Sequence, residues 1–177
     1  GDTGLYINLG EPTDYIRRTA QSFGLDIDPV DFLMLSASGD DFQSDSTYTL
    51  FSSAEVEGPD AVEHIRERIE ADGPDRVVID PATEFRYLTT DDHQFRNQIL
   101  ILLDYLRSSG ATVVFTSQAA ESMPDDDLQF LVDAVINVEE HPEYRTLRIS
   151  KFRFGYSHRG NHTLGISDAG MSVWPTL

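Results

Sequence analysis

The sequence predicts an α/β domain of three layers, in which a mainly parallel sheet lies between helices and carries antiparallel strands at its C-terminal edge. Short apolar runs alternate with segments whose apolar residues recur at helical spacing, which is typical of a parallel sheet with helices on both faces. After Pro142 apolar and polar residues alternate, as in antiparallel strands. A length of 177 residues, 40% of them hydrophobic, indicates a single domain over residues 1–177.

The individual elements follow from the apolar pattern and from the residues that end it. Val62, Ile65 and Ile69 form the buried stripe of one helix, and Gly73 and Gly110 each end a helix. Residues 39–55 carry many Asp and Ser and predict a surface loop. In chain order we expect strand 5–9, helix 13–23, strand 31–38, helix 58–73, strand 76–80, helix 91–110, strand 111–118 and strand 133–139, then antiparallel strands at 144–152, 162–167 and 171–174.

Composition excludes several classes of protein. Lys and Arg number 13 against 31 Asp and Glu, so the net charge of −18 should repel nucleic acid and anionic membrane. No apolar run approaches the roughly 20 residues of a membrane span, and the first residues lack the pattern of a signal peptide. The absence of cysteine excludes disulfides and thiolate zinc sites, and predicts a cytoplasmic protein. The acidic, lysine-poor composition is similar to that of proteins from salt-loving microbes, although an acidic mesophilic domain is the alternative.

Polar side chains follow three of the predicted strands, at the edge of a parallel sheet where ligands bind. Asp80 ends the strand 76–80, where a carboxylate can orient a water for attack on a γ-phosphate or, equally, cap the next helix. Glu11 follows the first strand and has the same two interpretations, catalytic or a favourable charge at a helix N-terminus. Thr116, Ser117 and Gln118 are either phosphate contacts or ordinary polar groups at a strand end.

The segment 150–162 concentrates basic residues in a chain that has few. It contains Lys151, which is the only lysine, together with Arg153, His158, Arg159 and His162. Arginine and lysine together are typical of phosphate recognition, so the segment predicts a local anion site. The alternative is an edge strand protected by charge. A metal site at His158 and His162 is a weaker alternative, because no carboxylate partner is indicated.

Four stretches together resemble the KaiC family of RecA-like ATPases, and the resemblance covers nearly the whole chain. They are "LYINLGEPTDYIRRTAQSFGLD", "DRVVIDPATEFR", "LRSSGATVVFTSQ" and the C-terminal "DAVINVEE" with "RTLRISKFR" and "SHRGNHTLGISDAGMSVWP". The chain is also similar to the KaiC-like signal-transduction ATPases of haloarchaea, in agreement with its acidic composition.

The resemblance implies a hexameric ATPase that binds ATP and Mg²⁺ at sites between subunits. Asp80 is then the Walker B aspartate that holds Mg²⁺ through water, and Glu11 helps to activate the attacking water. Lys151 and Arg153 reach the γ-phosphate of the neighbouring subunit, as an arginine finger does. His158 matches a histidine of the same family loop.

The sequence also departs from the family pattern. Gly10 replaces the first of two adjacent glutamates, Pro81 replaces a Ser or Thr, and the loop from Lys151 to His158 is slightly longer. No G-x-x-x-x-G-K-[ST] phosphate loop is present. We therefore expect the chain to be the C-terminal portion of a longer ATPase whose phosphate loop precedes Gly1. A non-hydrolytic signalling or scaffold module that binds protein partners is the alternative, and a RecA-like DNA-binding recombinase is a third, disfavoured by the charge.

Overall fold

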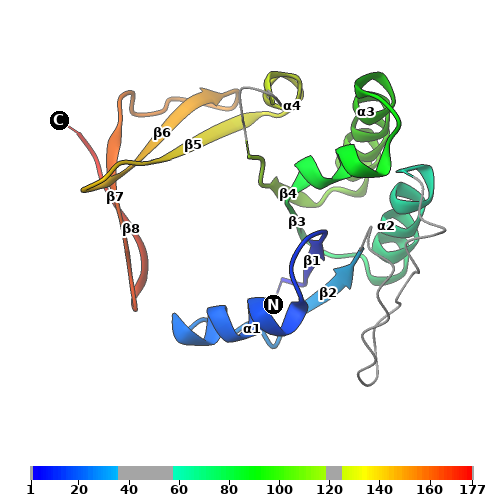
Figure 1. The fold of residues 1–177 in the computed structure, drawn as a ribbon, viewed down its shortest axis with the longest axis horizontal. Coiled ribbons are helices and arrows are strands. Elements are labelled where there is room, and N and C mark those ends of the chain that lie inside the picture. The colour runs from blue at the N-terminus through cyan, green and yellow to red at the C-terminus, as the bar shows by residue number, and fades with distance from the viewer. Residues whose placement is uncertain (1, 36–57, 119–124, 177) are drawn as a thin grey trace. The chain divides into compact units, whose positions relative to one another are not determined.

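The computed structural model describes residues 2–35, 58–118 and 125–176 (Figure 1). The chain divides into two compact units, one formed by Gly1–Arg17 and Ile27–Met123 and the other by Arg18–Asp26 and Pro124–Leu177. The end of the predicted strand 31–38, from residue 36 on, and the whole predicted loop 39–55 lie outside the described residues. That residues 1–177 form a single domain stays a prediction.

The first unit contains a parallel four-stranded sheet with the order β2-β1-β3-β4. Its strands are β1 (Gly4–Asn8), β2 (Val30–Met34), β3 (Arg76–Asp80) and β4 (Thr112–Phe115). All three pairings are parallel, and Asn8 lies opposite Asp80 at the carboxyl ends of β1 and β3. The predicted α/β class with a parallel sheet is therefore confirmed.

The two faces of this sheet differ in character because successive side chains of a strand point to opposite faces. Leu5 and Ile7 of β1 share one face with Val77 and Ile79 of β3, and each of the four is at most 2% exposed. Tyr6, Asn8, Val78 and Asp80 share the other face. The apolar face belongs to the core of the unit, and the other face carries the polar residues.

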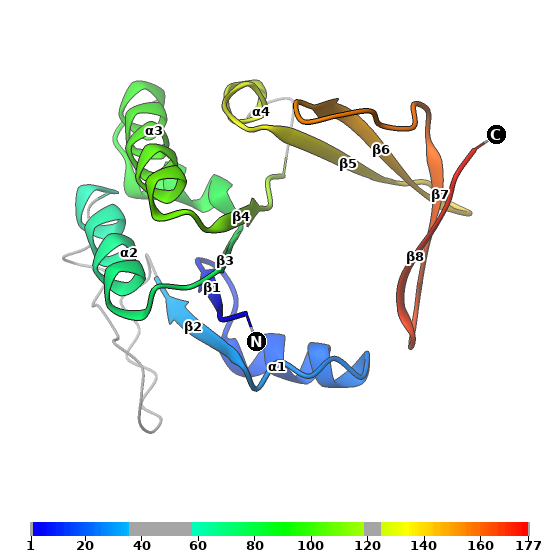
Figure 2. The same ribbon diagram turned by 180° about the vertical axis from the view of Figure 1, so that it is seen from behind.

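Helices α2 (Gly58–Asp72) and α3 (Asp92–Ser109) pack against each other and lie beside the parallel sheet (Figures 1 and 2). The predicted stripe of Val62, Ile65 and Ile69 is buried, which confirms that face of α2. Asp91 caps α3 by accepting the backbone N–H of Gln94 at 2.8 Å. Helix α1 (Thr13–Ser22) follows β1, and a short 3₁₀ helix η1 (Ala82–Leu88) follows β3. The sequence did not predict η1.

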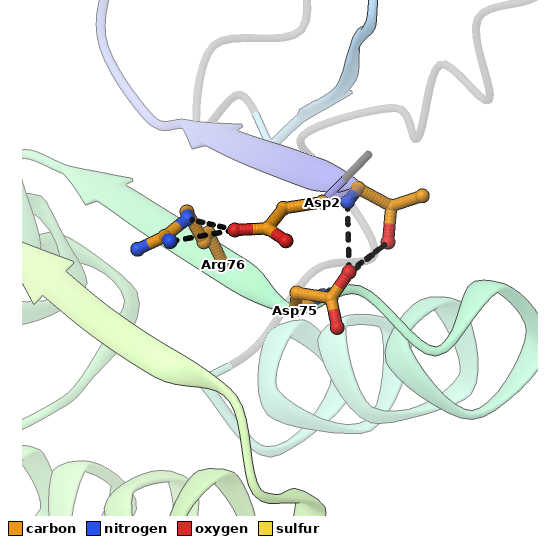
Figure 3. A network of polar contacts seen from close by, with 4 residues as sticks. Asp2, Asp75 and Arg76 are labelled. Atoms are coloured by element: carbon orange, nitrogen blue, oxygen red, sulfur yellow. Dashed lines mark hydrogen bonds and ion pairs between the residues drawn. The ribbon is translucent and has the colours of Figure 1, made fainter.

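A polar network joins the amino ends of β1 and β3 (Figure 3). The guanidinium of Arg76 donates to the carboxylate of Asp2, at 3.0 Å from Nε and 2.6 Å from Nη2. The carboxylate of Asp75 accepts the backbone N–H of Thr3 at 2.8 Å and its hydroxyl at 3.2 Å. The carbonyl of Asp75 also accepts the N–H of Thr112 at 2.9 Å, so this network reaches β4.

The second unit contains helix α4 (Asp126–Leu131) and an antiparallel four-stranded sheet. Its strands, in the order β5-β6-β7-β8, are β5 (Ala134–Glu140), β6 (Arg145–Phe152), β7 (His162–Ser167) and β8 (Gly170–Trp174). The antiparallel C-terminal strands are thus confirmed. They form a separate sheet, however, and do not extend the parallel one.

The strand predicted at 133–139 differs from expectation, since it belongs to this antiparallel sheet as β5. Its partner β6 is the next segment of the chain, connected by a tight turn in which the N–H of His141 donates to the carbonyl of Tyr144 at 2.8 Å. A short turn of this kind joins antiparallel neighbours, whereas a parallel pairing needs a long crossover.

None of the described helices is both long enough and apolar enough to cross a bilayer.

Candidate functional site

The carboxyl ends of β1, β3 and β4 meet at one edge of the parallel sheet. Backbone hydrogen bonds continue the pairing past the strands: the N–H of Leu9 donates to the carbonyl of Asp80 at 3.0 Å, and that of Thr116 to Ile79 at 3.0 Å. The N–H of Ala82 returns to the carbonyl of Thr116 at 2.9 Å. The segments that carry Glu11, Asp80 and Thr116 therefore lie side by side.

Asp80 is held on both of its carboxylate oxygens. The hydroxyl of Tyr6 on β1 donates to Oδ2, and the hydroxyl of Thr116 after β4 donates to Oδ1. The 3₁₀ helix η1 begins after Pro81, which follows a cis peptide bond. The carboxylate thus faces hydroxyls from the two neighbouring strands, and its alternative role as a helix cap does not match these contacts.

The hydroxyl of Tyr6 donates the hydrogen bond that it shares with Asp80. Burial raises the pKa of its phenol well above the ordinary value, and the hydrogen bond to Asp80 and the negative charges of Asp80 and Glu11 act in the same direction. The hydroxyl therefore keeps its proton at neutral pH. The Tyr6 ring also lies against Phe32 of β2, with 5.5 Å between the ring centroids.

A buried asparagine fixes the turn that carries Glu11. Asn8 is 2% exposed, and its Oδ1 accepts the backbone N–H groups of Gly10 at 3.1 Å and Glu11 at 3.0 Å. Its Nδ2 donates back to the carbonyl of Glu11. The Glu11 side chain itself is exposed. The main chain of the turn is therefore defined by β1, and the carboxylate of Glu11 extends from it into solvent.

Two of the departures from the family pattern, Gly10 and Pro81, lie next to each other. A Cβ atom at Gly10 would meet Cδ of Pro81 at 3.8 Å, which is an ordinary van der Waals contact. The space beside Pro81 therefore admits a side chain at position 10.

Among the three polar residues after β4, Thr116 contacts Asp80 directly. Ser117 is half-buried and Gln118 is exposed, and both follow at the same edge. The structure thus brings Glu11, Asp80 and Thr116–Gln118 to neighbouring positions at the carboxyl edge, as the strand pattern predicted.

Lys151 and Arg153 lie in the second unit, where both contact the C-terminal end of α4. Nζ of Lys151 donates to the backbone carbonyls of Gln129 at 2.9 Å and Phe130 at 2.8 Å. Arg153 pairs with Asp133, with 3.0 Å between Nη1 and Oδ1. The last carbonyls of a helix have no partner within the helix and attract cations, which accounts for the Lys151 contacts.

His158 is exposed, and its ring lies 5.6 Å from that of Tyr156. Its carbonyl lies 3.2 Å from Nε2 of His162, whose Nδ1 accepts the backbone N–H of Thr176 at 3.1 Å. Nε2 must therefore carry the proton that His162 donates. His162 is 4% exposed and both of its ring nitrogens are occupied, so it stabilises the loop.

Metal ligation by clustered side chains is not indicated in the described ranges. No group of three or more His, Asp or Glu residues within 2–35, 58–118 and 125–176 is arranged to hold an ion. Within those ranges, the carboxylate of Asp80 has the hydroxyls of Tyr6 and Thr116 as hydrogen-bond partners.

Sequence reasoning missed Tyr6 and Asn8. Both lie on the face of β1 that Asp80 occupies on β3, and the alternation of side chains along a strand is the signal that groups them. Using that signal requires knowing that β1 and β3 are neighbours with Asn8 opposite Asp80.

Comparison with known proteins agrees with this geometry. A family model with the description "ATPase: KaiC" matches residues 1–177. No curated protein sequence matched the chain. Because the family model spans all 177 residues and the parallel sheet ends in the polar edge described above, the chain belongs to the KaiC family of RecA-like ATPases.

Proposed function

We propose that this chain belongs to an ATP-hydrolysing KaiC-like core, with the carboxyl edge of β1, β3 and β4 directed at Mg²⁺ and the γ-phosphate. The observation that carries the proposal is the environment of Asp80. Its carboxylate ends the central strand β3, each oxygen accepts a hydroxyl, and the turn bearing Glu11 lies beside it.

The residues at this edge fit a magnesium ion held through water. A carboxylate has about four acceptor positions, and the hydroxyls of Tyr6 and Thr116 occupy one on each oxygen of Asp80. The remaining positions can accept hydrogen bonds from water. Mg²⁺ keeps several of its waters when proteins bind it, so outer-sphere contact with Asp80 is appropriate. When bound, the ion would neutralise charge on the phosphates.

Glu11 is the group we assign to the attacking water. Its carboxylate is exposed, so it can accept a hydrogen bond from a water beside the phosphate, and Asn8 fixes the backbone from which it extends. Thr116, Ser117 and Gln118 follow β4 at the same edge and are proposed as polar contacts to the nucleotide phosphates.

Lys151, Arg153 and His158 are proposed to act at the ATP site of a neighbouring subunit in a hexamer. Lys151 now bonds two main-chain carbonyls, and phosphate oxygens are stronger acceptors because they are charged. Moving from carbonyls to phosphate would keep its ammonium group hydrogen-bonded. A role in signal transduction, in an acidic haloarchaeal setting, is proposed from the composition and the resemblance.

A non-hydrolytic signalling module is the second candidate, and the Gly10–Pro81 neighbourhood favours it. Both positions depart from the family pattern, and a Cβ atom at position 10 would lie 3.8 Å from Cδ of Pro81 at the proposed site. This candidate expects protein-partner binding that does not depend on nucleotide. A pull-down from cell extract with and without Mg-ATP separates the two: unchanged capture supports the scaffold role.

Phosphate release by the full-length protein tests the leading proposal. We expect Glu11→Gln to lower kcat by 10²–10⁴, which is the usual contribution of a positioned acid–base group. Asp80→Asn should raise the Mg²⁺ concentration needed for half-maximal rate. Glu143→Gln, the same change at an exposed residue of the second unit, should leave the rate unchanged. If both site variants retain the parent's activity, Glu11 and Asp80 have no part in hydrolysis.

A further inference from the structure

We propose that Tyr6 is a positioning residue for Asp80, whose carboxylate it holds in the orientation that contacts the waters of Mg²⁺. The proposal rests on the function proposed above and names a residue that neither the sequence pattern nor the family match assigns. It is carried by the hydrogen bond from the Tyr6 hydroxyl to Oδ2 of Asp80.

The ring of Tyr6 is fixed independently of that hydrogen bond. On β2, Phe32 lies opposite Tyr6 in the sheet, and the two rings are tilted against each other, with 5.5 Å between their centroids and 31° between their planes. The guanidinium of Arg17 covers the Phe32 ring at 4.5 Å. The phenol is therefore oriented by β2 and α1 before its hydroxyl meets Asp80.

The direction of the phenol matches the strand geometry. Asn8 lies opposite Asp80, so Tyr6 is on the same face and two residues earlier along β1. Two residues of a strand span roughly 7 Å, and a tyrosine side chain is long enough to cover that distance along the strand. Its hydroxyl thereby reaches the carboxylate from the side of β1, while Thr116 reaches it from the side of β4.

Two donors are needed to hold the plane of a carboxylate. The last torsion of an aspartate is broad and roughly two-fold, so a single hydrogen bond leaves the carboxylate free to turn. Thr116 occupies Oδ1 only, and Tyr6 occupies Oδ2. Without the Tyr6 hydroxyl, the Asp80 carboxylate would keep its place in β3 but lose a defined orientation.

Such a partner should act on the affinity for metal more than on the rate at saturating metal. Hydrogen-bond partners of residues that ligate a metal directly typically change metal affinity or activity by 10–100-fold when they are removed, which sets an upper range for a carboxylate that contacts the ion through water. For Tyr6→Phe we expect the lower end, about tenfold, because Thr116 remains. The ring and its contact with Phe32 are retained, so the fold should be retained as well.

The test uses the full-length protein and two readouts. The first is the Mg²⁺ concentration that gives half-maximal phosphate release at saturating ATP. The second is Mn²⁺ binding in the presence of a non-hydrolysable ATP analogue, followed by electron paramagnetic resonance, which does not depend on turnover. We expect Tyr6→Phe to raise both values about tenfold, with kcat at saturating metal changed less than threefold. Thr116→Val should shift both values in the same direction.

Tyr105→Phe is the matched control. It removes another tyrosine hydroxyl that donates a hydrogen bond, here to the carbonyl of Arg66 at 3.3 Å on helix α2. It should change neither the Mg²⁺ concentration for half-maximal phosphate release nor the affinity for Mn²⁺. If Tyr105→Phe shifts them as far as Tyr6→Phe does, the effect is not specific to Asp80 and the proposal is overturned.

Asp80→Asn separates failure of the inference from failure of the proposed function. A shift in Asp80→Asn with parent-like curves in Tyr6→Phe overturns the role of Tyr6 and leaves the proposed function standing. A lower unfolding midpoint in Tyr6→Phe with unchanged metal curves assigns Tyr6 a purely structural role and also overturns it. If neither variant shifts, Asp80 does not serve the metal and the proposed function itself fails.

Discussion

Replacing Asn8 with alanine tests whether this buried side chain defines the turn that carries Glu11. Asn8 is 2% exposed and makes three hydrogen bonds to the main chain, two of them from the N–H groups of Gly10 and Glu11 at 3.1 and 3.0 Å. Each such bond contributes about 0.5–1.5 kcal/mol. Gly10 and Glu11 are exposed, so water can replace part of the loss, and the lower half of that range applies. We expect Asn8→Ala to lower the unfolding free energy by about 2 kcal/mol.

Urea unfolding followed by far-ultraviolet circular dichroism measures this loss, provided that the slope of the transition is unchanged. Asn137→Ala is the control, since Asn137 of β5 is only half-buried and accepts one hydrogen bond, from Ser150 at 2.7 Å. It should cost less than about 1 kcal/mol. Equal losses of unfolding free energy in Asn8→Ala and Asn137→Ala would refute the reasoning, because the three hydrogen bonds of Asn8 would then stabilise the protein no more than the single one of Asn137. Phosphate release by Asn8→Ala should also fall, since Glu11 loses its fixed backbone.

Two further predictions concern ionised groups outside the proposed metal site. Hydrogen bonds from the backbone and the hydroxyl of Thr3 hold the pKa of Asp75 below its ordinary value. A lowered folded-state pKa stabilises the protein above the unfolded-state value of about 3.9, and this contribution is lost as the pH falls through the folded-state pKa. Asp75→Asn should therefore lower the urea midpoint at pH 7 and flatten its fall below pH 4; parallel pH profiles would contradict this. Lys151→Met should lower the free energy of unfolding by about 1 kcal/mol, because the last carbonyls of α4 lose the cation that binds them. Arg148→Met, on the same strand, is the control and should leave the free energy of unfolding unchanged. A Lys151→Met protein as stable as the parent would show that those carbonyl contacts contribute nothing.

Much of the fold is encoded locally and was predicted. The stripe of Val62, Ile65 and Ile69 is buried, and the apolar run 76–80 is a strand in a parallel sheet. Gly110, with φ of 77°, ends α3 as expected of a residue that tolerates the left-handed conformation. Each of these depends on the spacing of neighbouring residues, which a single sequence displays.

What could not be predicted depends on which segments become neighbours. The hydrogen bond from Tyr6 to Asp80 forms because β1 lies between β2 and β3 in the sheet, an order that differs from the order along the chain. Lys151 contacts carbonyls of α4 that are more than 20 residues earlier in the sequence. The strand 133–139 has the same apolar pattern in a parallel or an antiparallel sheet, so its partner β6 could not be inferred. The catalytic and binding roles of Glu11, Asp80 and the basic segment 150–162 stay predictions.

The network of Asp2, Thr3, Asp75 and Arg76 at the amino edge has a consequence for which sequence changes the site can tolerate (Figure 3). β1 and β3 each have five residues, and these residues connect the network at the amino ends to the polar side chains at the carboxyl ends. A substitution within either strand keeps that length. A one-residue insertion or deletion would turn Tyr6 and Asn8 to the opposite face while the amino ends stayed anchored. Among functional relatives of this chain, β1 and β3 should therefore remain constant in length, while residues other than Tyr6, Asn8 and Asp80 vary in type.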